Sequence, residues 1–142
     1  MPRHIACMTF DFDALSLPIA KGTLTPTPLS RGEFGLVGVE RIRQLLKAHR
    51  IRATFFVPGH TIESFPDAVR ALVDDGHEIA CHGWTHRRPS ALTRAEERDE
   101  LVRAGAAIER ICGRAPTGYR SPSWDLSEHT LDLLLELGYA YD

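Results

Sequence analysis

The sequence predicts an α/β domain in which parallel strands alternate with helices. Short apolar stretches of strand length recur along the chain, and amphipathic stretches with helix-end signals lie between them. The composition, 43% hydrophobic and 25% charged, is that of an ordinary globular chain, and the length predicts one domain over residues 1–142. Alternating strands and helices imply a parallel sheet with right-handed crossovers.

The first part of the chain supplies two strands and one helix. Residues 4–10 form an almost continuous apolar run, which predicts a strand covered on both faces. Residues 14–34 are rich in proline and glycine and predict a long loop. The apolar spacing over residues 36–49 predicts a helix, and residues 52–57 predict a strand that stops at Pro58-Gly59.

A second helix and a third strand follow. Ser64 has the side chain of an N-cap, and it predicts a helix that runs to about Asp75. Pro66 in the first turn and Gly76 at the exit agree with those ends. Residues 77–81 then predict a short strand.

The last part of the chain continues the alternation. A helix over residues 93–112 opens with the capping-box spacing Thr93-Arg94-Ala95-Glu96. Residues 115–119 predict a fourth strand, and Ser127 begins a helix that ends at Gly138. Residues 139–142 resemble the start of a fifth strand.

Composition also sets the expected surroundings of the protein. A net charge of −2 without clustered positive excess argues against a nucleic-acid partner. The sequence has no apolar window of membrane-spanning length and no signal-peptide core, so we expect no membrane partner. Its three cysteines are not arranged in a C-x-x-C pair, which favours reduced thiols and a cytoplasmic protein.

Polar side chains with catalytic potential follow each predicted strand. In β/α folds the carboxyl ends of the strands meet at one rim, where the following loops open. We therefore expect residues distant in sequence to converge there. The candidates are Asp11, Asp13, His60, His82, His86 and Arg120.

A divalent metal site is the first expectation for this rim. His82 and His86 are four residues apart, and on one helical turn that spacing places both rings on the same side. The spacing alone is a weak signal in a chain with seven histidines. Together with the carboxylate of Asp13, the two imidazoles make a ligand set suited to zinc or a similar ion.

The remaining rim residues have competing interpretations. Asp11 and Asp13 project to the same side of an extended segment and need a neutralising cation, unless they are turn-capping acids. Arg120 is either a surface charge or a planar partner for a carboxylate. Trp124 either walls the site or fills the core. His60 is either a rim residue or part of an ordinary turn.

Three ordered segments resemble a known family. Thr9–Asp13, His82–His86 and Arg120–Trp124 are similar to the first three motifs of the polysaccharide deacetylase superfamily (NodB homology, carbohydrate esterase family 4). The spaced Asp-Phe-Asp resembles the branch with peptidoglycan-deacetylase-like and allantoinase-like members. Phe55–His60 and Gly76–Ala80 also look like that branch.

The resemblance implies roles for the rim residues. Asp11 would be the general base, oriented by Arg120, and Asp13, His82 and His86 would hold the metal. The fold would be the N-terminal half of a distorted (β/α) barrel, usually of seven strands. Family members continue with further strands, including a later histidine acid, so the domain is expected to be incomplete at its C-terminus.

The expected activity is metal-dependent hydrolysis of non-peptide amides. Removal of an N-acetyl group from an amino sugar is the leading hypothesis, with Trp124 and His60 as candidate substrate-binding residues. Small amides or cyclic imides are alternative substrates. The rival hypothesis is a non-catalytic half-barrel that binds metal or pairs with a partner chain, so we expect a homo-oligomer or a missing C-terminal half.

Overall fold

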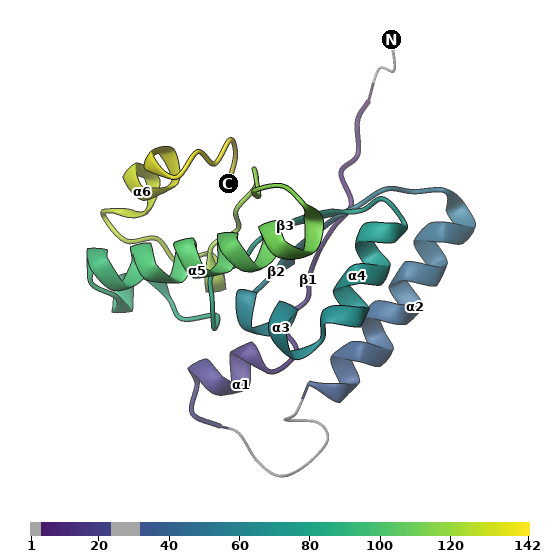
Figure 1. The fold of residues 1–142 in the computed structure, drawn as a ribbon, viewed down its shortest axis with the longest axis horizontal. Coiled ribbons are helices and arrows are strands. Elements are labelled where there is room, and N and C mark those ends of the chain that lie inside the picture. Colours follow the sequence, from purple (N-terminus) through teal and green to yellow (C-terminus); the bar gives the residue numbers. More distant parts are fainter. Residues whose placement is uncertain (1–3, 24–31) are drawn as a thin grey trace.

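A three-stranded parallel sheet forms the centre of the protein (Figure 1). The computed structural model describes residues 4–23 and 32–142. The strands β1 (Thr9–Asp11), β2 (Thr54–Val57) and β3 (Glu78–Cys81) lie in the order β1-β2-β3. The α/β class and the parallel pairing predicted from the sequence are therefore confirmed.

Helices follow each strand and cover the sheet. Helices α4 and α5 contact β3, α2 packs on α4, and α3 packs on α5. No described helix is long and apolar enough to span a membrane. The helices are α1 (Ser16–Ala20), α2 (Glu33–His49), α3 (Gly59–Ser64), α4 (Pro66–Asp74), α5 (Arg94–Cys112) and α6 (Thr130–Glu136), with 3₁₀ turns η2 (Pro89–Ala91) and η3 (Pro122–Trp124).

The hydrophobic core lies between the sheet and these helices. Alternate residues of a strand point to the same face of the sheet. The face toward the helices carries apolar side chains from both β2 and β3. Burial of these side chains fixes the strands against the helices, and so fixes the rim where the strands end. The core residues of these elements include Phe55, Val57, Ile79, Cys81, Val69, Leu72, Leu101, Ala104 and Ile108.

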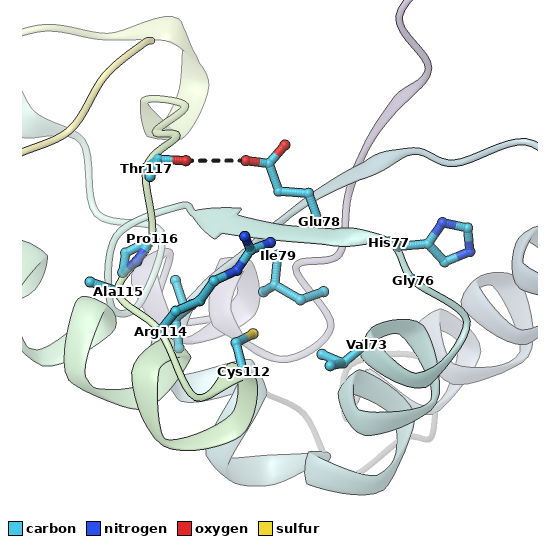
Figure 2. A pocket seen from close by; sticks show the side chains of 11 residues that line it. Val73, Gly76, His77, Glu78, Ile79, Cys112, Arg114, Ala115, Pro116 and Thr117 are labelled. Atoms are coloured by element: carbon cyan, nitrogen blue, oxygen red, sulfur yellow. Dashed lines mark hydrogen bonds between the residues drawn. The ribbon is translucent and has the colours of Figure 1, made fainter.

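The opposite face of the sheet carries polar contacts near the start of β3 (Figure 2). Glu78 accepts hydrogen bonds from the hydroxyls of Thr54 (2.7 Å) and Thr117 (3.4 Å). It thereby joins β2, β3 and the segment that follows α5. His77 and Glu78 also line a pocket of about 240 Å³ at the opposite end of β3 from the candidate site.

The predicted fourth and fifth strands appear only as isolated bridges. Cys81 pairs with Tyr119 and Gly118 pairs with Tyr141, both in parallel. The amide N–H of Arg120 also donates to the carbonyl of Cys81 at 2.9 Å. The order of the predicted elements holds, but their described pairing is too short to form regular strands.

The first predicted strand is wrong in extent and in burial. The strand begins at Thr9 rather than at residue 4, and Ile5 is 85% exposed. In the described sheet β1 pairs with β2 alone, so it is an edge strand. Hydrophobicity predicted a strand covered on both faces, but residues 4–8 are exposed.

Two predicted helix starts are also wrong. Ser64 is the last residue of α3, and α4 begins at Pro66, which needs no partner for an N–H it lacks. Ser127 precedes α6 and accepts a hydrogen bond from the amide of His129. The predicted loop over 14–34 contains α1, and its residues 24–31 lie outside the described residues.

Other helix ends agree with the sequence signals. Thr93 and Glu96 form the reciprocal capping box at the start of α5. Gly113 follows the end of α5 with a φ of 73°, a left-handed conformation that favours glycine. These ends set the position of α5, which turns out to hold part of the candidate site.

Candidate metal centre

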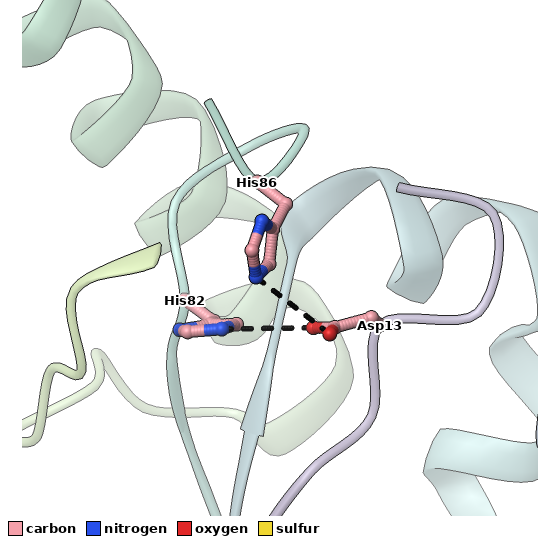
Figure 3. A group of neighbouring side chains, drawn as sticks. All are labelled: Asp13, His82 and His86. Carbon is pink, nitrogen blue, oxygen red and sulfur yellow. Dashed lines mark ion pairs between the residues drawn. The ribbon is translucent and has the colours of Figure 1, made fainter. Parts of the chain in front are cut away.

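One carboxylate and two imidazoles meet at the carboxyl ends of β1 and β3 (Figure 3). His82 Nε2 lies 3.6 Å from Asp13 Oδ1, and His86 Nε2 lies 3.6 Å from Asp13 Oδ2. These distances are long for hydrogen bonds. Ligand atoms about 2.1 Å from a tetrahedral ion lie about 3.4 Å from one another, so the observed spacing suits a shared cation.

The orientation of His82 leaves one ring nitrogen available as a ligand. Its Nδ1 lies 2.6 Å from the backbone carbonyl oxygen of Arg120. A carbonyl only accepts, so Nδ1 carries the hydrogen and the lone pair is on Nε2, which faces Asp13. Burial lowers the pKa of His82, and a neutral imidazole fixed through its other nitrogen is the usual form of a metal-bound histidine.

The carboxylate of Asp13 lacks partners that would satisfy it. Its Oδ1 is buried and accepts no hydrogen bond among the described residues. Burial raises the pKa of Asp13, whereas the nearby rings of His82 and His86 act in the opposite direction. A buried carboxylate without enough donors is costly, and a bound cation would remove that cost.

Buried hydroxyls hold the backbone of Asp13 in place. Its carbonyl oxygen accepts hydrogen bonds from Ser16 Oγ (2.7 Å) and Thr61 Oγ1 (2.7 Å). Both donors have no exposed surface. The next residue, Ala14, has a φ of 46°, so the chain turns sharply after β1. Sequence analysis missed Ser16 and Thr61, because neither lies in a recognisable motif.

A non-helical turn over residues 82–86, here called the histidine turn, carries His82 and His86. Gly83 has a φ of 70° and His86 a φ of 60°. The expected helical turn is therefore wrong, whereas the expectation that both rings lie on the same side is confirmed. The rings still meet, with centroids 4.9 Å apart, because the turn folds back on itself.

Glu100 of α5 holds this turn. One of its carboxylate oxygens accepts hydrogen bonds from the amides of Trp84 (2.7 Å) and Thr85 (3.1 Å). The other oxygen lies 3.3 Å from the hydroxyl of Thr85. Sequence analysis missed Glu100 as well, since a glutamate on a charged helix gives no sign of its partners.

The start of α3 braces the same turn from the other side. The amides of Gly59 and His60 donate to the carbonyls of Gly83 and Trp84, each at 3.0 Å. A Cβ atom on Gly59 would lie only 2.4 Å from the Trp84 ring, so close packing requires glycine there. The turn is thus held between α3 and α5.

Arg120 and Asp11 form an ion pair beside the three clustered residues. Arg120 Nη1 lies 2.5 Å from Asp11 Oδ1, and Nη2 donates to the hydroxyl of Thr9 at 2.9 Å. The guanidinium also lies 4.0 Å from the ring centroid of Phe56. These contacts fix one oxygen of the Asp11 carboxylate at the end of β1.

Comparison with known proteins shows which family the chain belongs to. The sequence model of the polysaccharide deacetylase family matches residues 36–141. The chain belongs to the polysaccharide deacetylase family. The family that the sequence resembles is thereby confirmed.

Relatives of this chain include two curated proteins. A peptidoglycan deacetylase of Helicobacter pylori is 42% identical over 135 residues, which cover 93% of this chain and 46% of that protein. A peptidoglycan deacetylase-like protein of Gibberella zeae is 34% identical over 141 residues, with 95% and 42% covered. The chain spans less than half the length of either relative.

Solved structures give the same picture of the fold. A Mycobacterium smegmatis protein assigned to the polysaccharide deacetylases matches with a TM-score of 0.85 and 35% identity. The match covers 94% of this chain and 48% of that one. This chain therefore has the fold of about half of a larger α/β structure.

Two further predicted residues, Trp124 and His60, lie outside the cluster. Trp124 is 84% exposed, so it does not fill the core. The His60 ring lies edge-on to Trp84 with centroids 6.4 Å apart, and its Nδ1 is 3.3 Å from Ser64 Oγ. Within the described ranges, His60 forms no hydrogen bond or ion pair with Asp13, His82 or His86.

Proposed function

We propose that this chain carries the metal-binding part of an amide hydrolase that removes acetyl groups from N-acetylated amino sugars. The observation that carries the proposal is the cluster of Asp13, His82 and His86 beside the Asp11–Arg120 ion pair. The names of the relatives support the substrate class. They include peptidoglycan deacetylases and a chitooligosaccharide deacetylase of Bradyrhizobium.

Asp13, His82 and His86 are the proposed ligands of zinc or a similar divalent ion. Such an ion, when bound, polarises the acyl carbonyl and lowers the pKa of a water molecule from 15.7 to about 7. The donor set of one carboxylate and two imidazoles suits it. The chain's own contribution is to hold the three donors at fixed positions through Arg120, Ser16, Thr61 and Glu100.

Asp11 is the proposed general base. A carboxylate that accepts a proton from the attacking water contributes roughly 10²- to 10⁴-fold to the rate. Arg120 restrains one oxygen of Asp11 and leaves the other for the proton. We propose that Trp124, with its exposed ring, contacts the apolar face of a sugar. The contacts of His60 favour a structural role in the brace on Trp84.

Replacing Asp11 by Asn tests the proposed chemistry. The Asp11→Asn variant keeps the shape of the side chain and the three proposed ligands, so it should bind zinc as wild type does. Acetate release from N-acetylglucosamine oligomers should fall by about 10²-fold or more, because Asn cannot take the proton. Undiminished acetate release by this variant would remove Asp11 from the mechanism.

A second candidate function is pairing with another chain through the edge of β1. Thr9 and Asp11 are exposed on this edge, and the described sheet leaves its second side without a strand. An open edge is a template for another strand. Sedimentation should give a concentration-dependent dimer or larger species; a monomer at all concentrations would exclude self-pairing.

A further inference from the structure

A pocket of about 280 Å³ adjoins the candidate metal centre on the side of His86. It lies between α1, the segment that follows the histidine turn, and the turn η3. Its apolar wall comes from α1 and from η2. The lining residues are Leu17, Ala20, Lys21, His86, Arg87, Arg88, Ala91 and Ser123.

The charge of this pocket is entirely positive. Lys21, Arg87 and Arg88 line it, and no carboxylate does. Arg87 lies 3.6 Å from Glu96, so part of its charge is balanced outside the pocket. Lys21 has no ion pair among the described residues, which leaves a positive excess facing the cavity.

The positive charge of Arg88 is balanced only by the more distant carboxylate of Asp125. Its charge helps to lower the pKa of Asp125, but the stronger causes there are hydrogen bonds from the amide and hydroxyl of Ser90. Both oxygens of Asp125 therefore already have donors, each at 2.8 Å. The guanidinium of Arg88 remains available to an anion in the pocket.

His86 belongs both to the proposed metal centre and to the wall of this pocket. Its Nε2 faces Asp13 at 3.6 Å, while the residue also forms part of the pocket wall. A substrate whose acetamide group lies at the proposed metal centre would therefore place a neighbouring substituent in the pocket. The cations there would attract a substituent that carries a negative charge.

We propose that this pocket binds a carboxylate that the substrate carries next to its N-acetyl group, so that acidic N-acetylated sugars are preferred over neutral ones. The inference rests on the proposed deacetylase function and narrows its substrate class. Bidentate contact with Arg88 supplies directionality, and Lys21 adds a point charge. One charge-assisted contact of this kind is worth roughly a tenfold preference or more.

A matched pair of substrates tests the inference. N-acetylmuramic acid glycans carry a lactyl carboxylate, and their methyl esters have the same shape without the charge. The wild-type protein should deacetylate the acid with a kcat/KM at least about tenfold above that of the ester. In the Lys21→Met/Arg88→Met double variant this ratio should fall to near one.

A control variant separates the pocket from general electrostatics. Arg98 is exposed on α5 and does not line the pocket, so Arg98→Met removes a positive charge elsewhere. This control should keep the wild-type ratio. Equal ratios in the wild type, the double variant and the control would overturn the inference, while deacetylation of both substrates would leave the proposed function standing.

Equilibrium binding covers the case in which neither substrate is turned over. That result would count against the proposed function alone. Binding of N-acetylmuramic acid and its methyl ester to the zinc-loaded Asp11→Asn variant would then be compared by calorimetry. Preference for the acid that disappears with Lys21→Met/Arg88→Met supports the pocket assignment, and equal affinities for acid and ester contradict it.

Discussion

The Nδ1–H of His82 donates to the backbone carbonyl of Arg120 at 2.6 Å. Arg120 in turn donates its own amide to the carbonyl of Cys81, the residue before His82. One residue thus fixes a proposed metal ligand with its backbone and pairs with Asp11 through its side chain. The proposed metal ligand His82 and the proposed base Asp11 are therefore both positioned by Arg120.

This double role predicts that the side chain of Arg120 can be removed without loss of metal binding. The carbonyl that accepts from His82 remains in Arg120→Met, but the restraint on Asp11 is lost. We expect turnover to fall about 10²-fold, the order expected for a misplaced catalytic group. Zinc affinity, measured by calorimetry, should stay within about threefold of wild type. A parallel loss of affinity and turnover would contradict the separation of the two roles.

Glu100 provides a second prediction, on metal affinity. Glu100→Ala removes the acceptor for the amides of Trp84 and Thr85, so the histidine turn loses its anchor. Zinc affinity should weaken by about 10- to 100-fold, the range for outer partners of metal ligands. Glu100→Gln keeps one acceptor oxygen and should restore most of that affinity.

Glu97, one turn earlier on the same helix, is the matched control. Its buried carboxylate accepts hydrogen bonds from the hydroxyls of Ser127 and Thr130, each at 2.5 Å. Both donors are far in sequence from the turn that carries His82 and His86. Glu97→Ala should lower the free energy of unfolding by about 1–3 kcal/mol and leave zinc affinity unchanged. If both alanine variants weaken zinc binding equally, Glu100 acts only through stability.

His77 predicts a pH dependence of stability. Its Nδ1 accepts from the amide of Ala53 at 3.2 Å, and burial lowers its pKa from the model-peptide value of 6.5. Below pH 6.5 the unfolded chain binds a proton that the folded protein does not. The free energy of unfolding should therefore fall as the pH drops from 6.5 to the folded-state pKa, and this contribution should be constant above 6.5.

His77→Asn isolates this contribution. The Asn side chain can accept from the amide of Ala53 and does not titrate, so its stability should decline less on acidification. Urea unfolding of both proteins at pH 8 and pH 5.5, with a chelator present, gives the comparison. Identical losses of stability in the two proteins would show that His77 does not contribute.

The sequence predicted which residues gather at the rim better than it predicted the backbone conformation around them. Asp13, His82 and His86 were grouped because each follows a strand, and parallel strands end at one rim. The conformation that brings the rings together was not predictable, because the positive φ of His86 depends on Glu100 and Gly59 from other elements.

The burial of β1 was also not predictable from the sequence alone. The apolar run over residues 4–10 predicted a covered strand, but burial depends on neighbours that a local pattern does not contain. Ser64 failed as a helix start for a related reason. Phe65 and Pro66 redirect the chain between α3 and α4, and a short helix before them was hidden by the Pro58-Gly59 turn signal.

Zinc titration of the metal-free protein tests the proposed cation site most directly. Calorimetry should give one ion per chain, with affinity at least about 10²-fold weaker in Asp13→Ala, His82→Ala and His86→Ala. His49→Gln changes an exposed histidine outside the cluster and should bind as wild type does. Absence of binding, or wild-type affinity in the three cluster variants, would contradict a metal site at Asp13, His82 and His86.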